Sequence, residues 1–193
     1  CLFLVSCQQG SDKLKKNLPD GVTLKDERLS LSVYAEDPDI MTPIGITIDS
    51  QNRIFVLESH THHDPEDYEG PESDRIKLMR DHNQDGKPDS ISIFAEGFEK
   101  GMNIEISPEG HLYLVSASEV WVVYDHDNDG VSESRKKVLD MVQPDYVYAH
   151  AGLMGITFSH DGWMYISRGN VASAGWKIEG TDGSSVSGYG DGG

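Results

Sequence analysis

One strand–turn–strand pattern occurs three times in the chain, and this repetition limits its fold more than any other feature. The stretches GITIDSQNRIFV, NIEISPEGHLYL and GITFSHDGWMYI begin at residues 45, 103 and 155 and align without gaps. Each alternates apolar and polar residues on both sides of a tight turn, as β-hairpins do. The turn has Asn52, Gly110 or Gly162 at the position that most needs a positive φ. The sequence therefore predicts three copies of one hairpin.

Two more strand-like segments follow each of the first two hairpins. The third strands are expected at RIKLMR (75–80) and VWVVYD (120–125), and the fourth strands at SISIFAEGF (90–98) and RKKVLDMV (135–142). Four strands in each repeat of about 40–58 residues are typical of the blades of a β-propeller. We therefore predict an all-β fold that contains two whole blades and the first half of a third.

The predicted propeller spans residues 29–193. Its first segment, LSLSVYAE (29–36), is expected as an outer strand that closes the ring with the final blade, whereas the last residues, GTDGSSVSGYGDGG, are expected to close no element. Because two and a half blades leave open sheet edges, we expect the chain to be a fragment with more protein beyond Gly193.

A glycine-centred acidic loop joins the third and fourth strands of both predicted blades. DHNQDGKPDS and DHDNDGVSES fit a calcium pattern in which positions 1, 3 and 5 supply side-chain oxygens and position 7 supplies a carbonyl. The expected ligands are Asp81, Asn83, Asp85, Lys87 and Asp89 in the first loop, and Asp125, Asp127, Asp129, Val131 and Glu133 in the second. Neither loop has the position-12 glutamate of an EF-hand, so weaker binding than that of a sensor is expected. The alternative is two Asp/Asn/Gly turns that bind nothing tightly.

Consecutive strands of a blade run in opposite directions, and this alternation (strand parity) places the acidic loops on one face of the disc and the remaining connections on the other. That other face, the expected active mouth, collects residues 59–74, 117–119, 145–151 and 168–174. His150 is a candidate general base there, or a structural histidine. Arg168 and Asn170 are candidates for binding an anionic or polar ligand, or merely end a strand.

Three histidines precede an acidic stretch in the first of these connections. His60, His62 and His63 could supply imidazole ligands to a transition metal. Because HTHHDPEDYEGPESD is polar and rich in turn formers, a solvent-exposed insertion is the favoured interpretation.

Charge and the N-terminal residues indicate the compartment. The net charge is −17, with 33 acidic and 16 basic residues, which disfavours nucleic acid and suits calcium. Leu-Val-Ser-Cys resembles a bacterial lipobox, so residues 1–7 are expected to be a lipoprotein signal remnant with the lipid on Cys7, and residues 8–28 a flexible linker. The alternative for residues 1–7 is an ordinary buried strand. We expect a lipid-anchored protein of the bacterial cell envelope, facing the periplasm or the surface, without a transmembrane helix.

The ordered set RIKLMRDHNQDGKPDSISIFAEGF, VWVVYDHDNDGVSES and HAGLMGITFSHDGWMYISRGN resembles the N-terminal propeller of planctomycete- and verrucomicrobial-type membrane-bound dehydrogenases. Those are relatives of the glucose/sorbosone dehydrogenases that use pyrroloquinoline quinone. The resemblance implies six blades when complete and, further on, a haem-binding cytochrome c domain as electron acceptor. It makes His150 the base that removes the substrate hydroxyl proton, although Ala151 stands where relatives often carry a second histidine. Most quinone-binding residues would come from later blades.

The patterns and the resemblance together lead to three candidate functions, the first of which is what the resemblance implies. The leading one is oxidation of a sugar or polyol hydroxyl, with His150 as base, the quinone as hydride acceptor and calcium in the acidic loops. The second is a non-catalytic, calcium-stabilised propeller that binds glycans or proteins at the cell envelope. The third is an adhesion function, with the acidic loops acting as those of integrin-like repeat propellers do.

Overall fold

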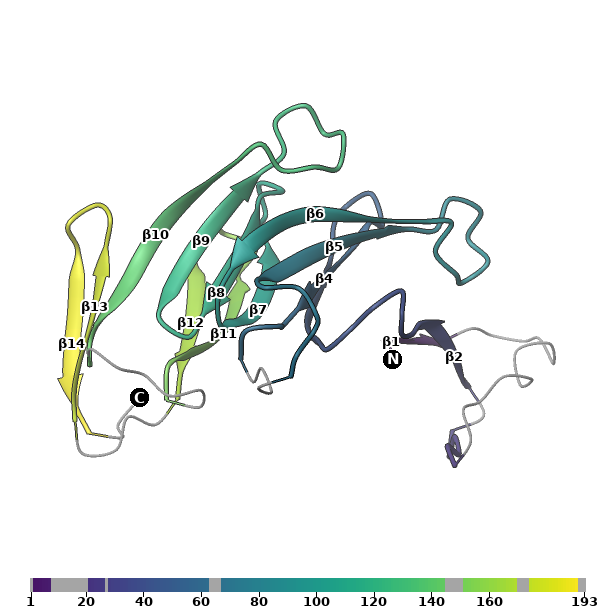
Figure 1. Ribbon diagram of the computed structural model, residues 1–193, viewed down its shortest axis with the longest axis horizontal. Helices are drawn as coiled ribbons and strands as arrows, with labels where there is room; N and C mark the ends of the chain where they lie inside the picture. The colour runs from purple at the N-terminus through teal and green to yellow at the C-terminus, as the bar shows by residue number, and fades with distance from the viewer. Residues whose placement is uncertain are drawn as a thin grey trace.

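The computed structural model describes residues 2–7, 21–26, 28–62, 67–144, 151–169 and 174–190, with only the backbone of residues 2–7. Every regular element in these ranges is a β-strand (Figure 1). Among the described residues, none lies in a helix long and apolar enough to cross a membrane. In chain order the strands are β1 (Leu2–Cys7), β2 (Leu29–Ala35), β3 (Pro43–Ile48), β4 (Ile54–Glu58), β5 (Asp74–Arg80), β6 (Ser90–Phe98), β7 (Gly101–Ile106), β8 (Leu112–Ser116), β9 (Glu119–Tyr124), β10 (Ser134–Gln143), β11 (Leu153–Phe158), β12 (Met164–Arg168), β13 (Gly175–Gly180) and β14 (Ser185–Tyr189).

The predicted propeller units are present. Strands β3 to β6 form one antiparallel sheet in chain order, called blade 1 here, and β7 to β10 form blade 2 in the same way. The third hairpin, β11–β12, forms a sheet of its own. The turns of the three hairpins have φ values of 61° at Asn52, 88° at Gly110 and 88° at Gly162. The prediction of three equivalent hairpins, and of the residues that allow their turns, is confirmed.

The last described residues form structure that the sequence did not indicate. Strands β13 and β14 form a hairpin that extends blade 2, because β13 pairs with β10 from Leu139↔Gly180 to Gln143↔Lys177. Trp176 and Ile178 of β13 pack against the same apolar cluster as Met141 of β10. The expectation that the glycine- and serine-rich end closes no element is therefore wrong, since apolar residues on β13 anchor the hairpin to blade 2.

At the other end, β2 is a strand as predicted, and its partner among the described residues is β1. The pairing runs from Leu2↔Ala35 to Cys7↔Leu29. Ring closure by β2 and lipidation of Cys7 remain predictions, and most of the expected linker, residues 8–20 and 27, lies outside the described residues.

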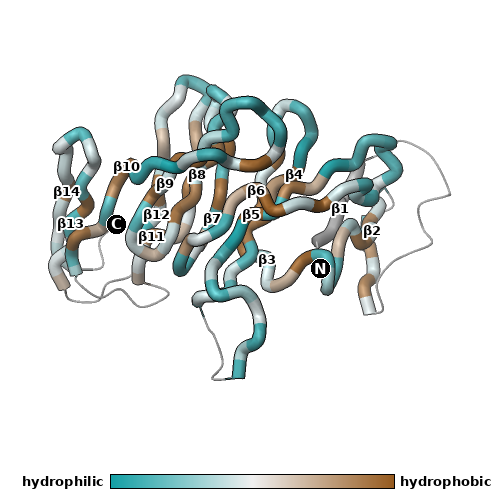
Figure 2. Tube along the Cα trace, turned by 45° about the horizontal axis from the view of Figure 1, so that its top comes forward, coloured by the Kyte–Doolittle hydropathy of each residue, from teal (hydrophilic) through white to brown (hydrophobic). Residues whose placement is uncertain are grey.

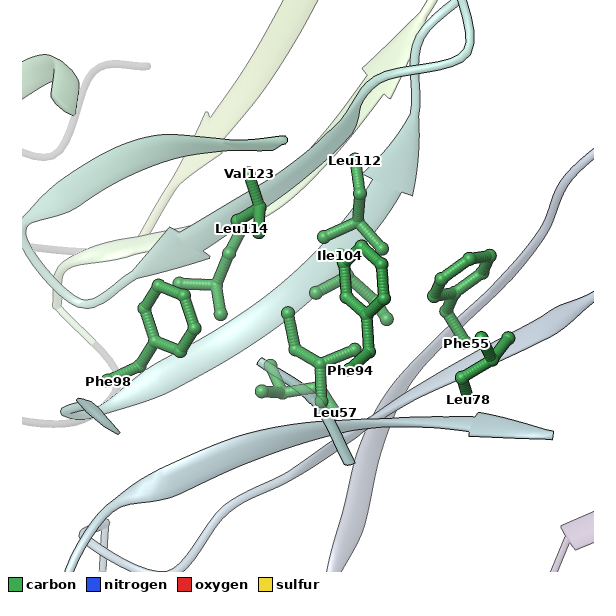
Figure 3. Packing of buried hydrophobic residues seen from close by; sticks show 10 residues of the cluster. Phe55, Leu57, Leu78, Phe94, Phe98, Ile104, Leu112, Leu114 and Val123 are labelled. Carbon is green, nitrogen blue, oxygen red and sulfur yellow. The ribbon is translucent and has the colours of Figure 1, made fainter. Parts of the chain in front are cut away.

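The main core lies between blades 1 and 2 (Figure 3). Phe55 and Leu57 on β4 point into it, and the Phe55 ring meets Phe94 edge-on, with centroids 4.9 Å apart. Leu114 on blade 2 packs against the same cluster. Burying each such side chain contributes about 1.5–3 kcal/mol. Alternation along β4 sends Val56 the other way, towards Tyr34 and Ile40 in a second cluster.

Apolar side chains remain exposed at both ends of the array. Ile44, Ile46 and Ile48 alternate along β3, while Trp163 and Tyr165 protrude from the third hairpin. In Figure 2 the hydrophobic stretches follow the strands and the hydrophilic ones follow most of the loops. The described sheets do not close into a ring, which identifies the fold as a partial β-propeller.

Candidate functional site

The connections at the predicted mouth are held together by one carboxylate, that of Asp74 at the start of β5. Its Oδ1 accepts hydrogen bonds from the backbone N–H groups of His60 (2.6 Å) and Thr61 (2.8 Å) and from the Thr61 hydroxyl (3.0 Å). Its Oδ2 accepts one from the Gly101 N–H at 2.6 Å. Asp74 is fully buried. It therefore fixes the β4–β5 connection of blade 1 to the first residue of blade 2.

The mouth connections of blade 2 and the third hairpin continue this chain of contacts. The Thr61 hydroxyl accepts from the Lys100 N–H (2.6 Å), and the Ala117 N–H donates to the Lys100 carbonyl (2.9 Å). The Leu153 N–H then donates to the Ala117 carbonyl (2.8 Å). Three successive propeller units thus meet at the face that strand parity predicts.

A second buried carboxylate, Glu58 at the end of β4, forms ion pairs with two basic side chains beside that face. Its Oε2 lies 2.5 Å from Arg75 Nε, and its Oε1 lies 3.0 Å from Lys77 Nζ and 2.7 Å from the Met41 N–H. Burial alone raises the pKa of the Glu58 carboxyl, but hydrogen bonds from Arg75, Met41 and Lys77 outweigh it and hold the pKa below its ordinary value. Glu58 is therefore an ionised, fully buried group.

His60 is buried, which corrects the expectation of a solvent-exposed insertion at this residue, whereas Asp67, Glu69 and Glu72 of the same segment are exposed as expected. Its Nε2 lies 3.4 Å from Glu58 Oε2, and its Nδ1 contacts the Tyr68 hydroxyl. The start of the polar segment lies inward because Glu58 and Asp74 supply hydrogen-bond acceptors to His60 and Thr61. The two imidazole nitrogens of His60 face Tyr68 and Glu58. His62 is half-buried and His63 lies outside the described residues, so metal binding by these histidines stays untested.

The predicted catalytic and cofactor-binding residues are only partly described. His150 and Asn170 lie outside the described residues. Ala151, directly after His150, is buried, and the Gly152 carbonyl accepts from the Gly169 N–H at 2.7 Å. Arg168 donates from Nη1 to the Gly169 carbonyl and lies 4.7 Å above the Trp176 ring. Arg168 is thus engaged with its own hairpin and with β13, and the described residues do not assemble a quinone-binding set.

The two acidic loops, called loop 1 (residues 81–89) and loop 2 (residues 125–133), share one backbone conformation. Positions 4 and 6 are left-handed in both, with φ values of 58° and 86° at Gln84 and Gly86, and 60° and 95° at Asn128 and Gly130. The first carboxylate of each loop accepts a hydrogen bond from the N–H at position 6. The ninth accepts one from the N–H at position 2. The in-register repeat is therefore also a structural repeat.

Loop 2 brings four carboxylates together, each offering an oxygen within 4.8 Å of the others: Asp125, Asp127, Asp129 and Glu133. This group could hold a metal ion. The pKa of the Asp127 carboxyl lies above its ordinary value. The hydrogen bond from the Asp129 N–H lowers this pKa, but desolvation and the neighbouring Glu133 and Asp129 carboxylates together raise it by more. The His126 N–H holds the pKa of Glu133 below its ordinary value. Carboxylate oxygens at this density suit a hard divalent cation.

In loop 1, the side chains at the equivalent positions make hydrogen bonds within the loop. Asp81 accepts from the Asp85 N–H (3.2 Å) and, through its other oxygen, from the Gly86 N–H (2.9 Å). Asn83 donates its side-chain amide to Asp89 Oδ1 at 3.1 Å. Loop 1 therefore satisfies its acidic groups internally to a greater extent than loop 2.

Sequence reasoning missed the buried polar network of Glu58, His60, Tyr68, Asp74 and Arg75. A signal existed, because Glu58 ends the otherwise apolar run IFVLE in a strand whose residues are all buried. Glu58 and Arg75 are also direct cross-strand partners. A charge pair at the ends of two buried strands indicates a buried ion pair, although not which loop it organises.

The fold and its two faces define the class of protein, which is a β-propeller with its strand connections gathered at one mouth. The chain belongs to a family described as "Domain of unknown function (DUF7133)", whose model matches residues 23–188. No curated protein matches the sequence significantly.

Three solved structures are similar to this chain, and the one with a TM-score above 0.5 supports the fold. A gluconolactonase from Xanthomonas campestris is 16% identical with a TM-score of 0.53, and the match covers 86% of this chain and 52% of that one. The PQQ domain of a pyranose dehydrogenase from Coprinopsis cinerea gives 16% and 0.46, over 72% of this chain and 28% of that one. An inactive virginiamycin B lyase from Staphylococcus aureus gives 18% and 0.45, over 79% and 42%. The chain therefore spans about half or less of each protein's length, and the likeness shows the fold alone.

Proposed function

We propose that this chain is the N-terminal part of a propeller that oxidises a hydroxyl of a sugar or polyol. The observation that carries the proposal is the anchoring of the segment after His150. Ala151 and Leu153 are buried, and the Leu153 N–H bonds to the Ala117 carbonyl at the mouth (2.8 Å). The described residues that follow the candidate base therefore contact the face where three propeller units meet, and this supports the proposal.

In this reaction the His150 imidazole accepts the hydroxyl proton while the carbon-bound hydrogen leaves as hydride to a two-electron acceptor. Pyrroloquinoline quinone, when bound, supplies that acceptor, as the sequence resemblance implies. Calcium in the acidic loops stabilises the scaffold, and a lipid on Cys7 places the protein at the cell envelope, with a cytochrome c domain as the next electron carrier. The Xanthomonas campestris structure is named a gluconolactonase, and this name is in line with a carbohydrate-related substrate.

The test is dye reduction by the full-length protein supplied with pyrroloquinoline quinone and calcium, over a panel of aldoses and polyols. His150→Ala is expected to lower kcat by about 10²–10⁴-fold, the usual contribution of a general base. The matched control is His160→Ala, because His160 is exposed in the turn of the third hairpin, on the opposite face. No turnover by the wild type, or full turnover by His150→Ala, would contradict the proposal.

A second candidate is a non-catalytic, calcium-stabilised propeller that binds glycans or proteins. The four-carboxylate group of loop 2 favours it, because a cation there serves the fold and not a reaction. Saturable glycan binding measured by calorimetry, without turnover of any quinone or dye, would support this candidate over the oxidoreductase.

A further inference from the structure

The two acidic loops have equivalent backbones but contain different numbers of negatively charged side chains. Loop 2 contains four acidic groups where loop 1 contains three, because Asn83 in loop 1 occupies the place of Asp127 in loop 2. Like charges this close repel one another unless a counter-charge lies among them. Loop 2 therefore has the greater need for a cation.

A single buried oxygen separates the two loops further. The Asp125 side chain is only 8% exposed, and its Oδ1 has no hydrogen-bond partner among the described residues. A buried carboxylate oxygen without a partner is costly, so such atoms normally pair with a donor or a metal. Asp81, at the equivalent position of loop 1, has hydrogen bonds to both oxygens.

The other oxygen of Asp125 faces blade 1. Asp125 Oδ2 accepts from the Gly130 N–H at 3.1 Å and lies 3.7 Å from Nη1 of Arg53, in the β3–β4 turn. Arg53 is itself fixed, because its Nε lies 2.5 Å from Asp49 Oδ2 and its guanidinium lies over the Phe55 ring. One oxygen of Asp125 is thus directed at blade 1 while the other is left for a ligand.

We propose that loop 2 is the high-affinity divalent-cation site of this protein, of calcium-type chemistry, and that Arg53 of blade 1 positions Asp125 as its first ligand. The inference rests on the proposal that the acidic loops bind calcium, and adds which loop does so and what it is joined to. Asp127, Asp129 and Glu133 complete the carboxylate set. An all-oxygen set of this kind selects calcium over softer metals such as zinc. Because Arg53 and Asp125 belong to different blades, the bound cation also strengthens the contact between blades 1 and 2.

The two loops provide a matched pair of variants for calcium titration calorimetry on chelator-treated, full-length protein. Asp129→Asn and Asp85→Asn each remove one charge at position 5. The asparagine side chain keeps an oxygen that can accept the hydrogen bond now made by the aspartate. That bond comes from the Val131 N–H to Asp129 at 2.8 Å in loop 2, and from the Lys87 N–H to Asp85 at 3.0 Å in loop 1. We expect Asp129→Asn to weaken the tighter calcium Kd by about tenfold or more, and Asp85→Asn to leave it within about twofold. A larger effect of Asp85→Asn, or equal effects, would overturn this inference while leaving calcium binding intact. If the wild type shows no heat of binding, the calcium proposal itself fails.

Arg53→Gln tests the positioning role because two physical effects oppose each other. Removing a positive charge near the site favours cation binding by Coulomb's law, whereas losing the group that orients Asp125 weakens it. The inference requires that orientation dominates, with calcium affinity reduced by about tenfold, the lower end of what supporting residues contribute. A structural role of Arg53 alone would lower the Tm without changing the calcium Kd measured below the Tm. An unchanged or tighter Kd would refute the link to blade 1.

Discussion

Substitution of Glu58 by Gln is expected to be among the most destabilising near-isosteric changes in this chain. The side chain keeps its volume, and it keeps one oxygen that can accept from the Met41 N–H. The negative charge between Arg75 and Lys77 is lost, although these two side chains are only 18% and 10% exposed. The Arg75 guanidinium and the Lys77 ammonium would then lose their shared anion in a largely buried site.

The magnitude follows from how little solvent reaches this group. Removing one partner of a buried ion pair costs about 3–5 kcal/mol, because the remaining charge is left uncompensated. Arg75 is partly exposed and can turn towards water, which favours the lower end, about 3 kcal/mol. For a chain of this length, 1 kcal/mol shifts the Tm by about 2–4 °C, so a decrease of about 6–12 °C is expected.

Urea denaturation monitored by circular dichroism measures this cost. The matched control is Glu179→Gln, which breaks an exposed pair with Lys177 and should cost less than about 0.5 kcal/mol. Lys77→Met should then recover at least about 1 kcal/mol when added to Glu58→Gln, because it removes an unpaired charge. A loss below about 1 kcal/mol for Glu58→Gln, or strict additivity of the two changes, would refute the interpretation of Glu58 as the anion of a buried network.

Three further predictions concern stability. Since the pKa of Glu58 in the folded state lies below its ordinary 4.5, its contribution is complete above pH 4.5 and is lost as the pH falls through the folded-state value, so the urea midpoint should fall more steeply below pH 4.5 in wild type than in Glu58→Gln. Asp74→Asn should cost about 2–4 kcal/mol by the same assay, because either orientation of the amide sets an N–H against a donor, that of Gly101 or those of His60 and Thr61, and a loss as small as that of an exposed aspartate would contradict this. Gly130→Ala should lower the Tm more than Gly86→Ala, because both have positive φ but only at Gly130 would the new Cβ meet Arg80 and Leu78, and equal losses would contradict it.

Local patterns in the sequence were sufficient to predict the hairpins and the blades. Alternation determines which residues of β4 face the core, and the turn residues Asn52, Gly110 and Gly162 have the backbone conformation that their type favours. These features depend on residues a few positions apart. The β13–β14 hairpin was missed because its stability comes from packing against Met141, some 35 residues earlier in the chain (176 − 141), which no local pattern records.

The candidate site divides in the same way. The equivalence of the two acidic loops follows from their spacing, and loops 1 and 2 share one backbone conformation; their ligand positions remain predictions. The burial of His60 could not be predicted, because it depends on acceptors at Glu58 and Asp74 on two different strands. Composition described the segment as polar, and a polar segment moves inward when the interior supplies its hydrogen bonds.

The difference between the two acidic loops depends on blade order as well as on their own residues. Arg53 reaches loop 2 because the β3–β4 turn of blade 1 lies beside the β9–β10 loop of blade 2, and the same neighbour relation brings Arg80 Nη2 to 3.3 Å from the Asp129 carbonyl. If the same neighbour relation repeats around the propeller, the counterpart for loop 1 would come from the unit that precedes blade 1. Under the proposal made above, a cation site at this fold position would be shared by a pair of blades. The same proposal makes its affinity depend on the turn residue of the neighbouring blade as well as on the acidic motif, so that two nearly identical decapeptides would differ in what they bind.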